Sequence, residues 1–338
     1  MQIETGVSLK PYNTFGLPAV AQTLVRVASA ADVRQVVDHP TLGRAPKFIL
    51  GGGSNIILTH DMPDAVLKIE VRGMRLVSES AAAWIVEAGA GENWHAFVMW
   101  TLDQGFPGLE NLALIPGTVG AAPVQNIGAY GVELQDRFDS LDVVDLVTGR
   151  DETLRADACA FGYRDSDFKH ARRGRSVITQ VRMHLPKVWR PVLGYLELER
   201  KVAQTGIDHP SPQQVAEWVC AIRRAKLPDP ALLGNAGSFF KNPVVTPEQC
   251  SDIIGRDPAV VHYSMPDGSI KLAAGWLIDA CGWKGKTVGG AAVYDKQALV
   301  LINRGGAIGA EVITLARAIQ ESVYGRFGIR LEMEPVIV

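Results

Sequence analysis

A serine between a glycine and two aromatic residues is the first candidate for chemistry in this sequence. Ser238 follows Gly237 and precedes Phe239 and Phe240. If the segment packs inward, the rings exclude water from the hydroxyl, which can then act as a proton donor. The surrounding residues do not form the G-x-S-x-G turn of serine hydrolases, and no His and Asp partners can be assigned. The alternative is a capping or turn serine, and a hydrolase triad is not expected.

A glycine-rich loop at residues 51–55, Gly-Gly-Gly-Ser-Asn, is the second candidate. Consecutive glycines let backbone N–H groups converge on an anion, because no Cβ blocks its approach. Ser54 and Asn55 can add side-chain donors, although a plain hairpin turn explains the same pentapeptide equally well. The Rossmann pattern is absent. Residues 285–287 do not form a P-loop, because Ala280 stands where its first glycine is required.

An uncharged, glycine-rich stretch from Asn111 to Gly131 is the third candidate. It has little helical or strand periodicity, and amide and hydroxyl groups are scattered through it. Such a segment can follow the outline of a large, mostly neutral ligand and offer it backbone hydrogen bonds. A buried irregular loop is the alternative, but a loop of this length is uncommon unless it is functional. We therefore expect it to contact a ligand.

Two charged positions have ordinary explanations when composition alone is considered. Arg164 precedes Asp165, and a solvated pair of these two residues is the simplest interpretation. Alternation along an extended segment puts Glu332 and Glu334 on one face of a strand, and such a face is usually solvated.

The elements that must position these residues form a mixed pattern. Apolar spacing, with a capping box at Ser211 to Gln214, predicts helices over residues 30–37, 91–103, 212–226 and 310–326. Strands are predicted at residues 47–50, 56–58, 83–86 and 329–338. Because no βαβ rhythm is sustained, the α+β class is favoured over a doubly wound sheet.

Length and composition bound the remaining possibilities. The 338 residues correspond to two or three domains at about 150 residues each. The contents of 47% hydrophobic and 21% charged residues exclude disorder as the main state. A net charge of -2 argues against a general nucleic-acid binder. The unusual feature is 34 glycines beside only 7% aromatic residues.

Signatures of targeting, membrane insertion and metal binding are lacking. The N-terminus has neither the basic region nor the apolar core of a signal peptide. Residues 111–132 are too polar and too often interrupted by proline and glycine to span a membrane. The four cysteines form no C-x-x-C pair, and no His pair has metal-ligand spacing. We expect a cytoplasmic protein with buried free thiols and no bound metal.

Taken together and in this order, the segments resemble the UDP-N-acetylenolpyruvoylglucosamine reductases, flavin enzymes that complete UDP-N-acetylmuramate for bacterial peptidoglycan. The resemblance extends from Leu9 to the final strand, nearly the whole chain. The strongest matches are Gly-Ala-Gly-Glu-Asn-Trp-His (89–95), Pro-Gly-Leu-Glu-Asn-Leu-Ala-Leu-Ile-Pro-Gly (107–117), Gln-Asn-Ile-Gly-Ala-Tyr-Gly (125–131), Phe-Gly-Tyr-Arg-Asp-Ser (161–166), Lys-Leu-Pro-Asp-Pro (226–230), Gly-Ser-Phe-Phe-Lys-Asn-Pro (237–243) and Lys-Leu-Ala-Ala-Gly-Trp-Leu-Ile-Asp (271–279).

This resemblance implies an α+β enzyme with a two-subdomain FAD-binding fold of the vanillyl-alcohol-oxidase (PCMH) type and a C-terminal α+β substrate-binding domain. The expected parts are residues 1–69 and 70–226 for the two FAD-binding subdomains, 227–325 for the substrate-binding domain, and 326–338 for a strand that carries Glu334 back to the active site. Non-covalent FAD is implied. NADPH is the co-substrate that reduces the flavin and leaves before the enolpyruvyl UDP-sugar binds. We expect a monomer with no nucleic-acid partner and no membrane insertion.

The resemblance also assigns catalytic roles. Hydride from the reduced flavin reaches the terminal carbon of the enolpyruvyl double bond, and the resulting enolate must be stabilised and then protonated. By the family match, Ser238 is the general acid, and Arg164 and Glu334 stabilise the enolate. A carboxylate would repel the enolate, so Glu334 is expected to be protonated and to donate a hydrogen bond.

Binding residues follow from the same match. The implied cofactor contacts are Gly51, Gly52, Gly53, Ser54, Asn55, Pro116, Gly117, Thr118, Gly120, Ala121, Asn126, Gly128, Ala129, Tyr130 and Gly131. The implied substrate contacts are the cations Arg223, Lys226 and Lys284, the residues Asn242, Tyr263 and Gln297, and Tyr195, whose segment folds over the substrate in the longer form of the family.

The sequence departs from the family pattern in two places. Ala121 and Ala122 replace a frequent hydroxyl pair, so the flavin phosphates must rely more on backbone N–H groups. The chain also lacks the basic residue that many relatives carry after Glu334. Two alternatives remain, an FAD-dependent oxidase of the same fold and a non-catalytic flavin or nucleotide-sugar binding module. The oxidase has no use for a UDP-sugar domain, and the module has none for the catalytic trio.

Overall fold

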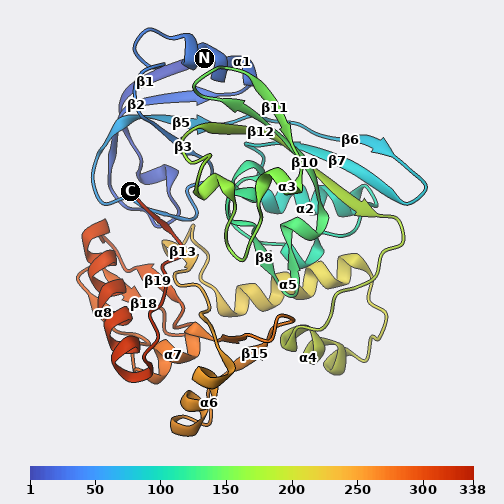
Figure 1. Ribbon diagram of the computed structural model, residues 1–338, viewed down its shortest axis with the longest axis vertical. Coiled ribbons are helices and arrows are strands. Elements are labelled where there is room, and N and C mark those ends of the chain that lie inside the picture. Colours follow the sequence, from blue (N-terminus) through green and yellow to red (C-terminus); the bar gives the residue numbers. More distant parts are fainter. The chain divides into compact units, whose positions relative to one another are not determined.

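The computed structural model describes residues 1–338, which form two compact units (Figure 1). Unit 1 consists of residues 1–7, 20–53 and 62–225, and unit 2 of residues 8–19, 54–61 and 226–338. Each unit mixes helices with strands, as expected for the α+β class. The predicted division of residues 1–226 into two subdomains stays a prediction.

Unit 1 contains a four-stranded sheet in the order β1 (Gln2–Ser8), β2 (Val20–Val27), β5 (Met62–Ile69), β3 (Lys47–Leu50). Strands β2 and β3 both run parallel to β5. Helix α1 (Ala30–Asp38) connects β2 to β3 and begins after Ser29, whose side chain accepts the backbone N–H of Asp32. Strand β5 buries Ala65, Val66 and Leu67 in succession, which is typical of a parallel strand covered on both faces.

The second sheet of unit 1 is antiparallel and has the order β11 (Asp151–Leu154), β10 (Phe138–Asp145), β12 (Ser176–Pro186), β7 (Ala83–Gly89), β6 (Met74–Glu79), five strands that run side by side in Figure 1. Side chains alternate along β12, where Val181 and Met183 are fully buried and His184 is exposed. The buried face shares one core with Phe97 of α2 (Trp94–Asp103).

Short elements complete unit 1. A two-stranded ladder pairs β8 (Gly128–Ala129) with β9 (Val132–Glu133), and the further helices are α3 (Ala156–Cys159), α4 (Leu196–Thr205) and α5 (Pro212–Lys226). Helix α5 begins with the predicted capping box, because Ser211 Oγ accepts the Gln214 N–H at 3.2 Å and Gln214 Oε1 accepts the Ser211 N–H at 2.8 Å. Single-turn 3₁₀ helices of unit 1 cover residues 110–112, 119–121, 123–125, 134–137 and 167–169, and one more, at residues 10–12, belongs to unit 2.

Unit 2 contains a four-stranded sheet, β13 (Asn235–Ser238), β19 (Val300–Asn303), β18 (Ala291–Val293), β17 (Thr287–Val288), and a three-stranded sheet, β14 (Val244–Val245), β16 (Ile270–Leu272), β15 (His262–Ser264). Its helices are α6 (Pro247–Arg256), α7 (Ala274–Ala280) and α8 (Gly309–Phe327). Helix α8 buries Val312, Leu315 and Ile319, as its apolar spacing predicts. It ends at Gly328, which adopts a φ of +71°.

The predicted final strand over residues 329–338 is wrong in extent. Only β20 (Val336–Ile337) is a strand, and it pairs in parallel with β4 (Ile56–Ile57). Pro335 has no backbone N–H to donate to a ladder, and Met333 makes only an isolated bridge with Phe240.

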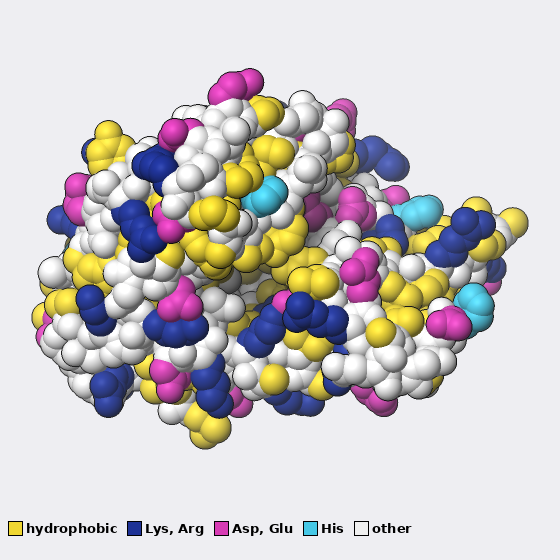
Figure 2. Space-filling model, turned by 90° about the horizontal axis from the view of Figure 1, so that it is seen from below, with side chains coloured by type: hydrophobic (Ala, Val, Ile, Leu, Met, Phe, Trp, Pro, Cys, Tyr) yellow, Lys and Arg dark blue, Asp and Glu magenta, His cyan; other side chains and the backbone are white.

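The mixture of charges on the surface and the burial of the cysteines agree with what the sequence predicts. Figure 2 shows basic and acidic side chains interspersed over the viewed face, as the net charge of -2 leads one to expect. Cys159, Cys220 and Cys250 are buried free thiols, and Cys281 is partly exposed. Every helix falls short of the length or the apolarity needed to cross a membrane.

Candidate active site

The predicted glycine cradle is built by close backbone approach in unit 1. Strand β3 leads directly into Gly51, and a Cβ on Gly52 would lie 2.8 Å from the Cα of Gly117. A Cβ on Gly51 would lie 2.8 Å from Thr118 Oγ1. The loop at residues 51–53 therefore lies against residues 117–118 at a distance that only glycine permits.

A lysine supports this loop from the neighbouring strand. Lys68 of β5 donates from Nζ to the Gly51 carbonyl at 2.6 Å. Burial lowers the pKa of Lys68. Sequence reasoning missed this residue, because its contact with Gly51 exists only once β3 and β5 are paired.

Thr118 supplies a hydroxyl to the cradle. Its Oγ1 atom is buried without a hydrogen-bond partner. The adjacent backbone is fixed by two bonds, from the Trp94 N–H to the Gly117 carbonyl at 3.1 Å and from the Gly120 N–H to the Ala90 carbonyl at 2.9 Å. A donor held in place without a partner is what an incoming anion requires.

Asn126 holds together the segment that was expected to line the ligand. It is fully buried with a φ of +43°, and its side-chain amide donates to Glu133 Oε2 at 2.9 Å and to the Gly162 carbonyl at 3.0 Å. Its Oδ1 atom accepts the Gln135 N–H. All of these bonds are internal, so the side chain of Asn126 organises the wall, and its part in cofactor binding stays a prediction.

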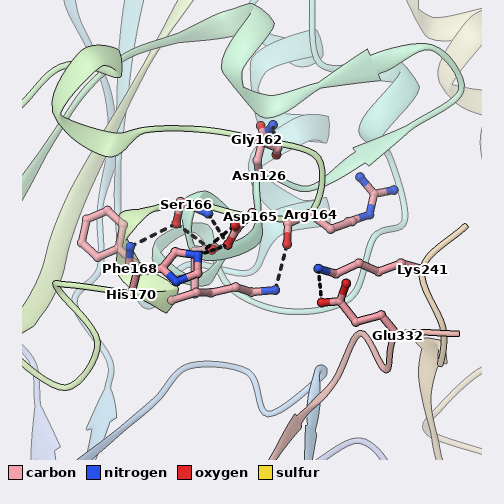
Figure 3. A network of polar contacts seen from close by, with 11 residues as sticks. Asn126, Gly162, Arg164, Asp165, Ser166, Phe168, His170, Lys241 and Glu332 are labelled. Carbon is pink, nitrogen blue, oxygen red and sulfur yellow. Dashed lines mark hydrogen bonds and ion pairs between the residues drawn. The ribbon is translucent and has the colours of Figure 1, made fainter. Parts of the chain in front are cut away.

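Arg164 occupies a strained turn whose polar contacts are drawn in Figure 3. Its φ is +55°, and the backbones of Gly162 and Asp165 hydrogen-bond to each other across it. Lys169 Nζ donates to the Arg164 carbonyl at 2.8 Å, and Arg164 Nη2 donates to the Gly128 carbonyl at 2.7 Å. A left-handed arginine persists only where its surroundings impose it, and such strain is concentrated at functional sites.

The simple pairing of Arg164 with Asp165 is wrong. Asp165 accepts from His170 Nε2 at 2.8 Å and from the Ser166 N–H at 3.0 Å. Partial burial acts to raise the pKa of Asp165, but the bonds from His170 and Ser166 outweigh it and lower that pKa. The guanidinium of Arg164 is thus directed to Gly128 instead.

A second arginine lies half-buried nearby in the same unit. Burial lowers the pKa of Arg223, the positive charge of Arg164 acts in the same direction, and Tyr130 acts to raise it. Burial likewise raises the pKa of Tyr130. Two partly buried guanidinium groups near each other repel, so this cluster favours an anion.

His95 borders this cluster as a neutral ring. Burial and the charges of Arg224 and Arg223 lower its pKa, and its Nδ1 accepts the Leu114 N–H at 3.1 Å. His95 belongs to the motif at residues 89–95, but nothing near it in the sequence predicted that it would lie close to Arg223.

In unit 2, Ser238 lies at the end of β13 beside a distorted register. Gly237 adopts a φ of +69°, and its N–H donates to Asn235 Oδ1 at 2.9 Å. The two following rings, Phe239 and Phe240, are buried and meet edge to face. The aromatic residues therefore pack inward as expected, while Ser238 itself is half-buried.

Glu334 is placed beside Ser238 through its backbone. Its N–H donates to the carbonyl of Phe239, the residue after Ser238, at 2.9 Å. Asn55 Nδ2 donates to the Glu334 carbonyl at 3.3 Å, and the Asn55 carbonyl accepts the Val336 N–H at 2.9 Å. Asn55 is thus the anchor of the chain end that carries Glu334.

Comparison with known proteins identifies the family to which this chain belongs. Residues 229–338 match the C-terminal domain of UDP-N-acetylenolpyruvoylglucosamine reductase, and residues 21–156 match an FAD-binding domain. The reductases of Burkholderia orbicola (strain MC0-3) and Burkholderia vietnamiensis are each 57% identical over 97% of this chain and 95% of their own length. The chain belongs to the UDP-N-acetylenolpyruvoylglucosamine reductase family.

This membership confirms several predictions. The chain is an FAD-dependent oxidoreductase, and the predicted class, an FAD-binding fold followed by a C-terminal α+β domain, is correct. The crystal structure of the reductase from Thermus caldophilus has the same fold over 100% of this chain and 99% of its own, with a TM-score of 0.70 and 25% identity. The oxidase and the binding module are set aside.

The residues of this reductase fit the cofactor. The orphaned Thr118 hydroxyl and the two glycines that leave no room for a Cβ form a cradle for a diphosphate. Thr118 offers a hydroxyl donor although Ala121 and Ala122 have none. Residues Gly51, Gly52, Gly53 and Thr118 would hold the FAD phosphates.

The predicted substrate residues of the reductase lie in different surroundings. Asn242 Oδ1 accepts the Ala274 N–H at 2.9 Å and so helps to begin α7. Lys284 forms an ion pair with Asp279 at 2.8 Å. The Leu299 N–H donates to Gln297 Oε1 at 3.3 Å, and Tyr263 is 42% exposed on β15. Lys226 is the last residue of α5. Substrate contact stays a prediction for all five.

Proposed function

We propose that this chain catalyses the NADPH-dependent, FAD-mediated reduction of the enolpyruvyl group of UDP-N-acetylglucosamine enolpyruvate to UDP-N-acetylmuramate. The observation that carries the proposal is the pair of arginines in the FAD-binding unit. Arg164 is held in a left-handed turn against Gly128, and Arg223 lies half-buried beside Tyr130. Two confined guanidinium groups next to the cofactor wall suit a substrate with a carboxylate and a diphosphate.

The chemistry that FAD supplies when bound is hydride transfer to the terminal carbon of the enolpyruvyl double bond. Arg164 then stabilises the negative charge that spreads into the substrate carboxylate. Its fixed turn matters because a preorganised donor needs no rearrangement in the transition state.

Ser238 donates the proton that completes the reduction, and Glu334 donates a hydrogen bond to the enolate in its protonated form. Two features support these roles. Ser238 directly precedes the buried rings of Phe239 and Phe240, and the Glu334 backbone is bonded to Phe239. The assigned substrate contacts are Tyr195, Arg223, Lys226, Asn242, Tyr263, Lys284 and Gln297. Since the substrates are intracellular metabolites, we assign the enzyme to the cytoplasm. We also assign it as a monomer.

Anaerobic stopped-flow absorbance tests the reaction. NADPH should bleach the flavin of the holoenzyme, and the enolpyruvyl UDP-sugar should restore its absorbance rapidly. UDP-N-acetylglucosamine, which lacks the enolpyruvyl double bond, is the matched control and should restore nothing. If the enolpyruvyl compound also fails to re-oxidise the flavin, the proposal is wrong.

Replacing the serine separates the two half-reactions. Ser238→Ala should leave flavin reduction by NADPH nearly unchanged and slow re-oxidation by the enolpyruvyl substrate by about 10²- to 10⁴-fold, the usual contribution of a general acid. Ser251→Ala, an exposed serine of α6, is the control and should slow neither step. Equal slowing of both steps by Ser238→Ala would show that Ser238 has another role.

A further inference from the structure

A segment without regular structure carries Tyr195 in unit 1. We call residues 187–195 the strap; it follows β12 and leads into α4. Trp189, Val192 and Leu193 of the strap pack against the core of unit 1. At its end, the ring of Tyr195 meets the ring of Tyr130 edge to face, with centroids 5.2 Å apart.

Two consecutive buried polar residues hold the strap. Glu110 is 2% exposed, and its Oε1 accepts the indole N–H of Trp189 at 2.8 Å, while Oε2 accepts the Gly108 N–H at 2.7 Å. Asn111 is fully buried, and its Nδ2 donates to the Val192 carbonyl at 2.9 Å. We call Glu110 and Asn111 the strap clamp.

The same amide group of Asn111 reaches a second target. Its Nδ2 also donates to the carbonyl of Tyr130 at 2.8 Å, and Tyr130 adopts a φ of +49°. One side chain therefore fixes the strap and the residue against which Tyr195 lies. The side-chain amide of Asn111 has no part in the proposed catalytic or binding roles.

The burial of these groups argues against a merely space-filling role. A buried carboxylate and a buried amide each cost free energy unless every polar atom is satisfied. Asn111 even leaves its Oδ1 atom without a partner. Apolar residues of similar volume would fill the core more favourably, so the hydrogen bonds to the strap are what these two residues add.

We propose that Glu110 and Asn111 are positioning residues, which hold the strap in place before the UDP-sugar arrives, so that Tyr195 at its end can close over the bound substrate. The inference rests on the proposed function, which gives Tyr195 its contact with the substrate. A segment ordered in advance does not have to be ordered on binding. The strap clamp should therefore lower the KM for the nucleotide sugar and leave reduction of the flavin by NADPH unaffected.

Trp189→Phe in the holoenzyme is the direct test, because it removes the indole N–H and keeps an aromatic ring on the core. Trp100→Phe is the matched control; Trp100 lies in α2 and packs on Phe97 and Phe106. Lys187 of the strap precedes Val188, which is 78% exposed, so trypsin cleavage after Lys187 can report docking in the absence of substrate. For Trp189→Phe we expect cleavage after Lys187 and the KM for the enolpyruvyl UDP-sugar each to rise about tenfold, the effect of one lost hydrogen bond to a carboxylate.

Further variants test the strap clamp independently, in case Trp189→Phe does not fold. Asn111→Ala should act in the same direction, and Glu110→Gln should act more weakly, because its one amide oxygen can still accept one of the two N–H groups, of Trp189 and Gly108, that Glu110 accepts. Combining Glu110→Gln with Trp189→Phe should raise the KM no further than Trp189→Phe alone, since both act on one contact. Flavin reduction by NADPH should stay within about twofold of the wild type in every variant that retains FAD.

Tyr195→Ala distinguishes failure of the clamp from failure of the proposed function. If Tyr195→Ala raises the KM while Trp189→Phe changes neither cleavage nor the KM, the clamp is overturned and the function stands. The clamp is also overturned if Trp189→Phe speeds cleavage and leaves the KM unchanged. If Tyr195→Ala leaves the KM unchanged, the substrate contact of Tyr195 fails, and the positioning role fails with it.

Discussion

At the scale of the residue, Gly52 has no room for a side chain, because a Cβ there would lie 2.8 Å from the Cα of Gly117. Gly52→Ala should push the two loops apart, at a cost of about 1–3 kcal/mol for overpacking, and should weaken FAD binding about tenfold or more. Titration of the apoprotein with FAD, followed by flavin fluorescence, measures this affinity. Gly255→Ala is the control, since nothing lies within 4 Å of its Cβ position in α6. Equal FAD affinity in both variants would show that residues 51–53 do not hold the cofactor.

Residue types revealed the glycine cradle, Ser238 and the proposed catalytic residues Arg164 and Glu334 only as candidates. Three consecutive glycines by themselves predict a close approach of the backbone. The two aromatic residues after Ser238 predict that this segment packs inward. The partners of Arg164 could not be predicted, because Gly128 and Lys169 meet it only through the folded turn, while the nearest opposite charge, Asp165, binds His170 instead. Lys68 and Asn111 stayed hidden for the same reason: their hydrogen bonds reach 17 to 81 residues along the chain.

At the scale of the element, the five-stranded sheet of unit 1 carries a charged ladder across its strands. Arg182 of β12 forms ion pairs with Glu87 of β7 at 2.8 Å and with Asp142 of β10 at 2.5 Å. Partial burial acts to raise the pKa of Asp142, but the hydrogen bonds from Arg182 and Thr153 outweigh it and lower that pKa. Arg182→Met should lower the free energy of unfolding by about 1–3 kcal/mol at neutral pH, because Asp142 loses its ion pair and buried Glu87 keeps only its pair with Arg75.

The pH dependence of this effect follows from the sign of the shift. A carboxyl whose pKa is lowered by folding stabilises the fold above its unfolded pKa of about 4 and loses that contribution as pH falls through the folded pKa. The difference between wild type and Arg182→Met should therefore shrink as urea midpoints are measured from pH 7 down to about pH 3. Arg34→Met removes an exposed pair with Asp151 and should change stability by no more than about 1 kcal/mol. A difference that stays constant over this range would contradict the assignment.

Elements with local signals were predictable, and those set by distant partners were not. Helix α5 was predictable from Ser211 and Gln214, because a capping box is a contact between near neighbours. The chain end was not, because strand β20 exists through its parallel partner β4, about 280 residues away, and Pro335 interrupts the expected ladder. Parallel pairs and short strands carry little periodicity of their own.

At the scale of the whole molecule, the chain passes between the two units five times, after residues 7, 19, 53, 61 and 225. A linear division at about residue 227 therefore separates only part of unit 2 from unit 1. Segments 8–19 and 54–61 belong to unit 2 because they form hydrogen bonds with residues that are far away in the sequence. Asn303 Nδ2 donates to the Phe15 carbonyl at 3.0 Å, and Asn55 anchors the chain end at Glu334.

These interleaved segments lead to a prediction about the C-terminal part alone. Residues 229–338 lack Leu9, Phe15, Leu17, Ile57 and Leu58, each at most 1% exposed in the full chain. Burying such side chains contributes about 1.5–3 kcal/mol each, so their loss removes about 10 kcal/mol, as much as the whole stability of a typical domain. The isolated fragment should therefore show poorly dispersed amide NMR signals and no cooperative thermal transition. Adding the complementary fragment 1–228 should restore both the transition and tight FAD binding. A fragment that folds cooperatively by itself would show that segments 8–19 and 54–61 are dispensable, and that the linear domain division was the correct one.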